Sequence, residues 1–221
     1  MDILQQHELF EIEVLEKMNS AKVLEPLVFG GGTMLRLCHE LNRYSMDLDF
    51  WFVKDIPQKD FFQKVGKTFS KEYEVTDSQI KRYTLLFELR SPLYPKRLKI
   101  EIRREIKECD FQNKIAFSKI AAKQVVLKAH TLPQVMKNKI AAFLDRGEIR
   151  DSFDIEFLLR RGIDLPALSH QQIIQCKKKL AGFKDRDFKV KLGSIIEKDI
   201  REYYLSNRFS FLEEKFASIL S

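Results

Sequence analysis

The chain has 221 residues, of which 44% are hydrophobic and 32% are charged, a balance that excludes a disordered polypeptide and fits a globular protein with an ionic surface. The length suffices for one domain of ordinary size and a smaller helical one. Lysine and arginine number 39 against 32 acidic residues, and the resulting formal net charge of +7 favours polyanionic partners such as nucleic acid or nucleotide phosphates.

No stretch of the sequence approaches the roughly 20 continuous apolar residues that a membrane-spanning helix needs. The first residues lack the basic segment and apolar core of a secretion signal, so we expect a cytoplasmic protein. The three cysteines, Cys38, Cys109 and Cys176, are far apart and form no CxxC pair, which argues against a disulfide framework and a zinc site.

The first residues of the chain predict a helix that covers a sheet. Residues 2–24 carry apolar side chains at helical spacing along one face. The short apolar run at 27–29 predicts a buried strand, because three glycines stop it at 30–32. Thr33 can cap a short helix over residues 34–41.

The segment at 46–53 predicts the central strand of this sheet, because apolar residues occupy both of its faces. Residues 61–69 are helical in pattern. Further strands are predicted at 72–76, 83–90 and 98–103, and the last two alternate apolar with polar residues, so each presents a solvated face. Together these elements predict an α+β fold with a small mixed sheet.

The second half of the chain is helical in pattern from Leu132 onward. After two helices, the remainder predicts three more, with Ser169 and Asp185 as N-caps. We place the lobe boundary near residue 122, so that residues 1–122 form the α+β lobe and residues 123–221 form a helical lobe.

The segment at 43–50, Arg-Tyr-Ser-Met-Asp-Leu-Asp-Phe, carries the most informative pattern. Asp47 and Asp49 are two residues apart in a predicted strand, so both carboxylates point to the same side. Two like charges there repel each other unless a cation compensates them, and Mg²⁺ prefers hard oxygen ligands. Glu101, on the polar face of the strand at 98–103, can supply a third carboxylate. Three carboxylates can hold two metal ions, which clamp the attacking and leaving oxygens of an in-line phosphoryl displacement.

The alternative is a pair of solvated surface carboxylates, which is the common reading of an isolated Asp-x-Asp. The preceding strand, the turn Gly31-Gly32-Thr33 and the helix that follows favour the metal site. Backbone N–H groups at a helix N-terminus bind phosphate, and glycine lets the chain approach closely. One short helix and a turn separate this turn from the carboxylates, so a phosphate-binding turn and metal ligands are expected on neighbouring strand ends.

The run at 28–50, VFGGGTMLRLCHELNRYSMDLDF, resembles the signature of the AbiEii/AbiGii toxins, which are polymerase-beta-type nucleotidyltransferases. In that signature an apolar strand, a Gly-Gly-Thr turn, a Leu-Arg helix and an Arg-x-Ser-x-Asp-x-Asp-Phe stretch follow in order. The run at 139–162, KIAAFLDRGEIRDSFDIEFLLRRG, is similar to the downstream helix pair of the family. The resemblance therefore covers the first lobe and the start of the helical lobe, and it ends near Gly162.

The resemblance implies an enzyme that binds a nucleoside triphosphate (NTP) and two Mg²⁺ ions in a cleft that the helical lobe completes. Such an enzyme transfers the nucleotide to an acceptor, often the acceptor end of tRNA, and blocks growth until a cognate antitoxin intervenes. The expected setting is a toxin–antitoxin or phage-defence system. The expected mechanism is in-line attack of an acceptor hydroxyl on the α-phosphate, with pyrophosphate as the leaving group.

By position, the resemblance implies that Asp47, Asp49 and Glu101 are the metal ligands and that Glu101 activates the acceptor hydroxyl. It also implies that Lys139 contacts the triphosphate and that Asp154 closes the second motif. The full set of residues expected to bind the NTP is Gly31, Gly32, Thr33, Arg36, Arg43, Ser45, Lys139, Arg146, Arg150 and Asp154.

The chain departs from the family pattern at three positions. Gly30 stands where relatives commonly have lysine, Asn138 replaces a frequent acidic residue, and Glu101 replaces a more usual aspartate. The longer side chain of Glu101 can still bind a metal ion, whereas its reach as a base is in question. None of the three departures removes the expected site.

Lys139, Arg146 and Arg150 form one stripe if they share a continuous helix, and such a stripe can neutralise a triphosphate. Gly147 can interrupt that helix. The alternative from spacing alone is a solvated basic face, with Asp151 as the N-cap of the next helix.

Two other functions stay open. One is a nucleotidyltransferase-like module that binds RNA or a protein without catalysis, and the retained carboxylates argue against it. The other is a nucleotidyltransferase that acts on a small molecule or a protein side chain, and the basic net charge favours RNA over these acceptors.

Overall fold

The computed structural model describes residues 1–219 of the chain, which divide into two units. The first unit comprises Met1–Glu40 and Tyr44–His130, and the second comprises Leu41–Arg43 and the described part of Thr131–Ser221. Within residues 1–219, no helix is both long and apolar enough to cross a membrane.

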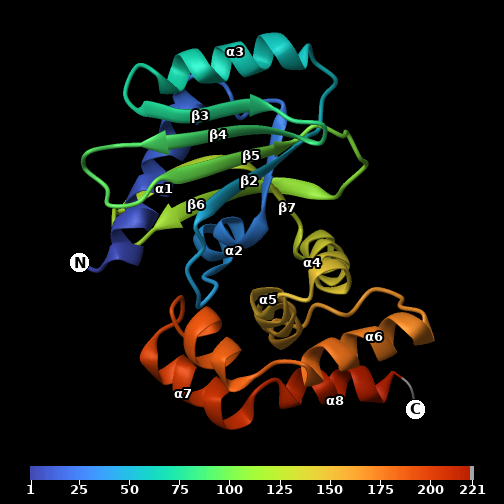
Figure 1. The fold of residues 1–221 in the computed structure, drawn as a ribbon. Helices are drawn as coiled ribbons and strands as arrows, with labels where there is room; N and C mark the ends of the chain where they lie inside the picture. Colours follow the sequence, from blue (N-terminus) through green and yellow to red (C-terminus); the bar gives the residue numbers. More distant parts are fainter. Residues whose placement is uncertain (220–221) are drawn as a thin grey trace. The chain divides into compact units, whose positions relative to one another are not determined.

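A mixed sheet of seven strands forms the centre of the first unit, in the order β3-β4-β5-β2-β1-β7-β6 (Figure 1). Strand β2 lies in the middle, parallel to β5 and antiparallel to β1, so its predicted central position is confirmed. The strands are β1 (Leu27–Gly30), β2 (Asp47–Phe52), β3 (Glu74–Ile80), β4 (Thr84–Arg90), β5 (Leu98–Arg103), β6 (Phe111–Ser118) and β7 (Lys123–His130).

The residues of β2 alternate between the two faces of the sheet. Leu48, Phe50 and Phe52 are buried on one face, while the residues between them are half-buried on the other. Phe29 of β1 pairs with Phe50 in the strand register, and the two rings stack with centroids 5.0 Å apart. This alternation separates an apolar face from a polar one, because successive side chains of a strand point to opposite sides.

Helices α1 (Ile3–Ser20) and α3 (Gln58–Phe69) cover the apolar face (Figure 1). Phe61 of α3 packs edge-on against Phe52, with ring centroids 5.2 Å apart. Asp2 is the N-cap of α1, and its side chain accepts a hydrogen bond from the backbone N–H of Gln5 in a capping box. The predicted cover helix is confirmed, although it ends at Ser20 rather than near residue 24.

Strands β6 and β7 were not predicted, and they make the sheet larger than the small one expected. They form an antiparallel hairpin, and β7 joins the sheet through a parallel pairing of Ala129 with Phe29. Strand β6 is an edge strand with Ile115 and Phe117 exposed, so its apolar residues do not mark a buried face. Ala122, the expected boundary, lies in the hairpin turn with φ +51°, and the division between the units falls after His130 instead.

The second unit is helical. Thr131 caps α4 by accepting from the N–H of Gln134, and Ser169 caps α6 in a capping box with Gln172, as predicted for Ser169. Asp185 is not an N-cap, because it lies within the helical segment that leads into η1, whose N-cap is Arg186. The elements are α4 (Leu132–Arg146), α5 (Ile149–Arg160), α6 (His170–Ala181), the π-helix η1 (Asp187–Leu192), α7 (Lys198–Asn207) and α8 (Ser210–Ser218).

Candidate active site

Three carboxylates lie on the polar face of the sheet, on adjacent strands. Asp47 and Asp49 are half-buried on the face of β2 opposite its phenylalanines. Because β2 and β5 are parallel and in register, Asp49 pairs with Glu101 and Asp47 pairs with Lys99. Side chains at paired positions of neighbouring strands point to the same face. The strands predicted from the sequence therefore bring together the three acidic residues that the sequence singled out.

Gly31 holds the start of α2 (Gly31–His39) against Asp49. Its φ is +74°, and a Cβ added there would clash with Asp49 Oδ2 and lie 3.0 Å from Asp49 Cγ. Glycine alone accommodates both the positive φ and the close approach. The N-cap of α2 is Gly30, which provides no side-chain hydrogen bond to the first turn. A helix N-terminus thus lies beside one of the carboxylates, with first-turn N–H groups of the kind that bind phosphate.

Gly31→Ala is expected to lower the free energy of unfolding by about 1–2 kcal/mol from the positive φ alone. The matched control is Gly66→Ala in α3, where φ is not positive and an added Cβ would lie 3.9 Å from Phe87 Cε1. That control is expected to raise stability by about 0.5–1 kcal/mol, because alanine favours a helix interior. Urea unfolding of both variants measures the difference. Equal stability of the two variants would contradict the geometry at Gly31.

Thr33 lies inside α2 instead of capping it, which corrects the sequence-based prediction. The side chain is fully buried, and Oγ1 donates a hydrogen bond to the backbone carbonyl of Asp47 at 2.7 Å. Oγ1 also lies 3.3 Å from Glu11 Oε1, and burial raises the pKa of Glu11 well above its usual range. Thr33 therefore fixes α2 to the start of β2, and only its backbone N–H is suited to a phosphate.

Arg36, expected to contact the nucleotide, is engaged within the first unit. Its Nε donates to Glu8 Oε2 of α1 at 2.5 Å, and its guanidinium lies 3.7 Å from the centre of the Tyr44 ring. Glu8 also accepts from Ser118 Oγ of β6 at 2.8 Å. Arg36 thus ties α2 to α1. Ser45 is half-buried in the segment leading into β2.

Gly30 cannot be replaced by the lysine common in relatives unless its neighbours move. A Cβ at Gly30 would lie 2.5 Å from Trp51 Cζ3 and 2.8 Å from His130 Nδ1. The two rings lie 4.8 Å apart, and His130 is buried without a hydrogen-bond partner among residues 1–219. Burial lowers the pKa of His130 to about 4, so the imidazole is uncharged at neutral pH. Trp51 and His130 therefore fill the space that a longer side chain would need.

In the second unit, Arg43, Lys139 and Asp154 form a buried cluster. Arg43 Nε and Nη2 donate to Asp154 Oδ1 at 2.6 Å and Oδ2 at 2.7 Å, a bidentate pair. Lys139 Nζ lies 2.6 Å from Asp154 Oδ2, and Asp154 is completely buried. Burial alone would raise the pKa of Asp154, but the charges and hydrogen bonds of Arg43 and Lys139 lower it below its ordinary value. These residues compensate one another's charges inside the unit.

The predicted basic stripe does not form, because α4 ends at Arg146 and Gly147 follows in the left-handed conformation with φ +66°. Arg146 donates through Nε and Nη2 to both carboxylate oxygens of Asp151, at 2.7 and 2.8 Å. Arg150 is exposed on the next helix. Asp151 is not the N-cap of α5, a position that Glu148 occupies, and it lies in the first helical turn.

The donor set on the sheet fits a divalent cation in its chemistry, since carboxylate oxygens are the ligands that Mg²⁺ prefers. Glu101 Oε1 is paired with Lys99 Nζ at 2.5 Å. Among residues 1–219, no three His, Cys, Asp or Glu side chains are arranged to hold a metal ion. Asp47 and Asp49 are therefore the residues suited to hold a first metal ion. Glu101 can join them as a ligand only if its side chain leaves Lys99.

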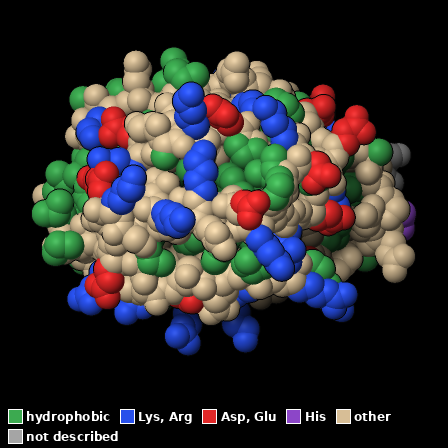
Figure 2. Space-filling view, turned by 90° about the horizontal axis from the view of Figure 1, so that it is seen from above, with side chains coloured by type: hydrophobic (Ala, Val, Ile, Leu, Met, Phe, Trp, Pro, Cys, Tyr) green, Lys and Arg blue, Asp and Glu red, His purple; other side chains and the backbone are tan. Residues whose placement is uncertain are grey.

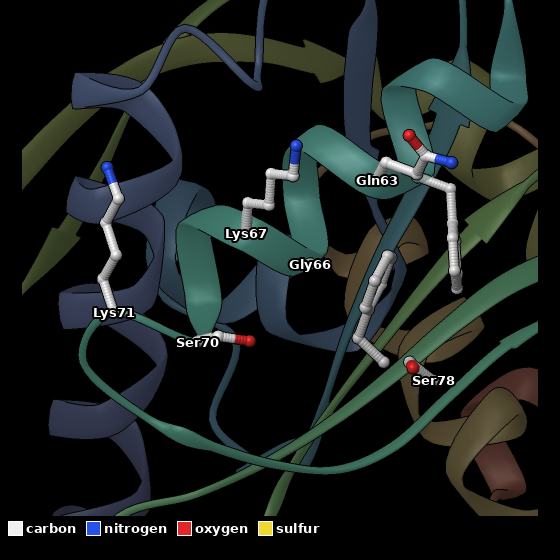
Figure 3. A pocket seen from close by; sticks show the side chains of 8 residues that line it. Gln63, Gly66, Lys67, Ser70, Lys71 and Ser78 are labelled. Atoms are coloured by element: carbon white, nitrogen blue, oxygen red, sulfur yellow. The ribbon is translucent and has the colours of Figure 1, made fainter.

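A groove of about 600 Å³ lies on the opposite side of the sheet, between α3 and strands β3 and β4 (Figure 3). Its floor is apolar, and Phe62 and Phe87 stack there with ring centroids 4.6 Å apart. Phe87 pairs with Ile100 on the apolar face, so the groove is separate from the carboxylates. The lining residues are Phe62, Gln63, Gly66, Lys67, Ser70, Lys71, Ser78 and Phe87.

Comparison with known proteins agrees with the resemblance seen in the sequence. Residues 13–216 match the family described as nucleotidyl transferase AbiEii toxin, type IV toxin–antitoxin system. The fold is similar to that of MenT4, a nucleotidyltransferase toxin of Mycobacterium tuberculosis H37Rv, with a TM-score of 0.53 and 18% identity over 97% of this chain and 91% of that chain. It is also similar to JHP933 of Helicobacter pylori, with a TM-score of 0.50 and 20% identity over 94% of each chain.

At these identities the structural likeness shows the fold alone, and the predicted α+β nucleotidyltransferase fold with helices after the sheet is confirmed. No curated protein sequence matches the chain. The match of residues 13–216 extends the resemblance beyond Gly162, where the sequence motifs ended.

Proposed function

The chain belongs to the AbiEii nucleotidyltransferase toxin family of type IV toxin–antitoxin systems. We propose that it transfers a nucleotide from an NTP to RNA, with Mg²⁺ as cofactor. The observation that carries the proposal is the convergence of Asp47, Asp49 and Glu101 on one face of the sheet beside the turn at Gly31. Membership of a type IV system also implies an antitoxin as partner.

In this mechanism the backbone N–H groups of Gly31, Gly32 and Thr33 bind phosphate oxygens of the NTP. Asp47 and Asp49 would hold the metal ion, and the chemistry it would supply is positive charge against the triphosphate and pyrophosphate. Glu101 accepts the proton of the acceptor hydroxyl as the new bond from that oxygen to the α-phosphorus forms. The bond between the α-phosphorus and the bridging oxygen breaks, and its electron pair leaves with pyrophosphate.

We assign Arg43, Lys139 and Asp154 to the stability of the second unit, because each charge in the cluster has a partner at hydrogen-bond distance. Contact of Lys139 with the triphosphate stays a prediction that requires the ammonium to leave Asp154. Arg150 is exposed on α5, so its side chain is accessible to a substrate.

RNA, and specifically the acceptor end of tRNA, is the acceptor that we propose. The net charge of +7 favours a polyanion over a small molecule or a protein side chain. On the face seen in Figure 2, lysines and arginines are interspersed with acidic side chains. We therefore expect RNA affinity to be moderate and to fall with increasing salt.

The test is a transfer assay with the purified full chain, each labelled NTP in turn, and total tRNA. We expect label in tRNA in the presence of Mg²⁺ and none after chelation, with mass spectrometry locating the added nucleotide at the tRNA end. Overproduction in cells should stop growth in an Asp47-dependent manner. RNA binding without transfer from any NTP would favour the non-catalytic module instead. Label in a protein or a small molecule would show that this molecule, and not tRNA, is the acceptor.

A further inference from the structure

Lys99 lies among the carboxylates of the candidate active site, although no motif pointed to it. In the strand register it pairs with Asp47 of β2 on one side and with Glu88 of β4 on the other. Glu101 follows two residues later on the same strand and therefore shares its face. The polar face of the sheet thus places one ammonium group within a row of acidic side chains.

The ammonium of Lys99 interacts with several of these carboxylates. Its Nζ lies 2.5 Å from Glu101 Oε1. The hydrogen bond with Glu101 is the main cause that raises the pKa of Lys99, and the negative charges of Asp47 and Asp49 raise it further. The side chain of Lys99 is 41% exposed, so solvent provides a route by which the ammonium can leave.

Most ion pairs with such exposure contribute little to stability, because water screens them. In this pair the charge of Lys99 lies near several carboxylates rather than one. Arg97 Nη1 donates to Glu88 at 2.7 Å, so its charge is paired outside the three carboxylates. Lys99 is therefore a cation that offsets the mutual repulsion of Asp47, Asp49 and Glu101 when no metal ion is bound.

We propose that Lys99 is the internal counter-ion of the carboxylate site and that a divalent metal ion must displace its ammonium from Glu101 before Glu101 can become a ligand. The proposal rests on the function proposed above, because it concerns the same site. It predicts that metal affinity is held below the value that the three carboxylates alone would give. Metal binding and the release of Glu101 are then one coupled event.

The experiment is a titration of the full chain with Mn²⁺ by isothermal titration calorimetry, without nucleotide. Lys99→Met is expected to bind Mn²⁺ about tenfold more tightly than the unsubstituted chain, because the competing charge is removed. Lys99→Arg keeps the charge and is expected to change the affinity little. Lys67→Met, at the groove on the opposite side of the sheet, removes the same charge far from the carboxylates and is the matched control.

The outcomes separate the two proposals. If the unsubstituted chain binds Mn²⁺ in an Asp49-dependent manner and Lys99→Met binds it equally well or less well, the counter-ion role is overturned and the metal site stands. If neither protein binds Mn²⁺, the metal-dependent function and the counter-ion role are both overturned. Binding by Lys99→Met alone supports the proposal. Circular dichroism of each variant verifies the fold.

Discussion

Asp49→Asn is expected to lower nucleotide transfer on the order of 10³-fold, because it removes the negative charge that holds the metal ion against the triphosphate. Asp49 lies in register with Glu101 and against Gly31, so it adjoins both the third carboxylate and the phosphate-binding turn. Asparagine keeps the size of the side chain, and the close contact with Gly31 is therefore preserved. The measurement is the initial rate of label transfer from NTP at saturating Mg²⁺.

Asp55→Asn is the matched control, since Asp55 is exposed after β2 and its replacement changes the net charge by the same amount. Its transfer rate should remain close to that of the unsubstituted chain. Thermal unfolding of both variants checks that the loss at Asp49 is not a loss of fold. Transfer by Asp49→Asn at the rate of the control would refute the role of this carboxylate in metal binding.

The acidic face of the sheet is predictable from the sequence because it depends only on the two-residue repeat of a β-strand. Alternation in a strand fixes which residues share a face, so Asp47 and Asp49 were assigned to one side from spacing alone. The pairing of Asp49 with Glu101 also required that the two strands be neighbours in this register. The same alternation places Lys99 with Glu101 in the segment LKIEI, and this signal was present in the sequence but was not used.

Features that depend on contacts distant in the sequence were not predictable. The positive φ of Gly31 and its approach to Asp49 follow from the packing of α2 onto the sheet. Strand β6 escaped prediction because it is an edge strand whose apolar residues are partly exposed. A strand without a clean alternation of buried and exposed residues gives little signal, and its existence is decided by the partner strand.

The ion pairs of the second unit illustrate the same limit. Lys139 and Arg146 have the spacing of a solvated basic face or a phosphate-binding stripe. Their actual partners, Asp151 and Asp154, lie on the following helix, and the bend at Gly147 brings the two helices together. Helical spacing indicates which residues share one face of a helix. Which neighbouring helix this face contacts depends on the turn between the two helices.

Asp154→Ala is expected to lower the free energy of unfolding of the second unit by about 3–5 kcal/mol, because it leaves Arg43 and Lys139 buried without their shared counter-charge. Both cations lie within 2.7 Å of Asp154 oxygens, and the carboxylate is completely buried. Asp164→Ala is the matched control, since Asp164 is exposed and its loss should change stability by less than about 0.5 kcal/mol. Urea unfolding measures both variants.

The pH dependence gives an independent check with a definite sign. Arg43 and Lys139 hold the pKa of Asp154 below its unfolded-state value, so its contribution is complete at neutral pH and is lost as the pH falls through the lowered folded-state pKa. Asp154→Ala should remove that part of the acid sensitivity. Replacing the whole cluster, as Arg43→Met, Lys139→Met and Asp154→Leu together, should recover much of the lost stability, because no uncompensated charge remains. If the single variant is as stable as its control, or the triple variant is less stable than the single one, the cluster does not stabilise the unit in the way its geometry indicates.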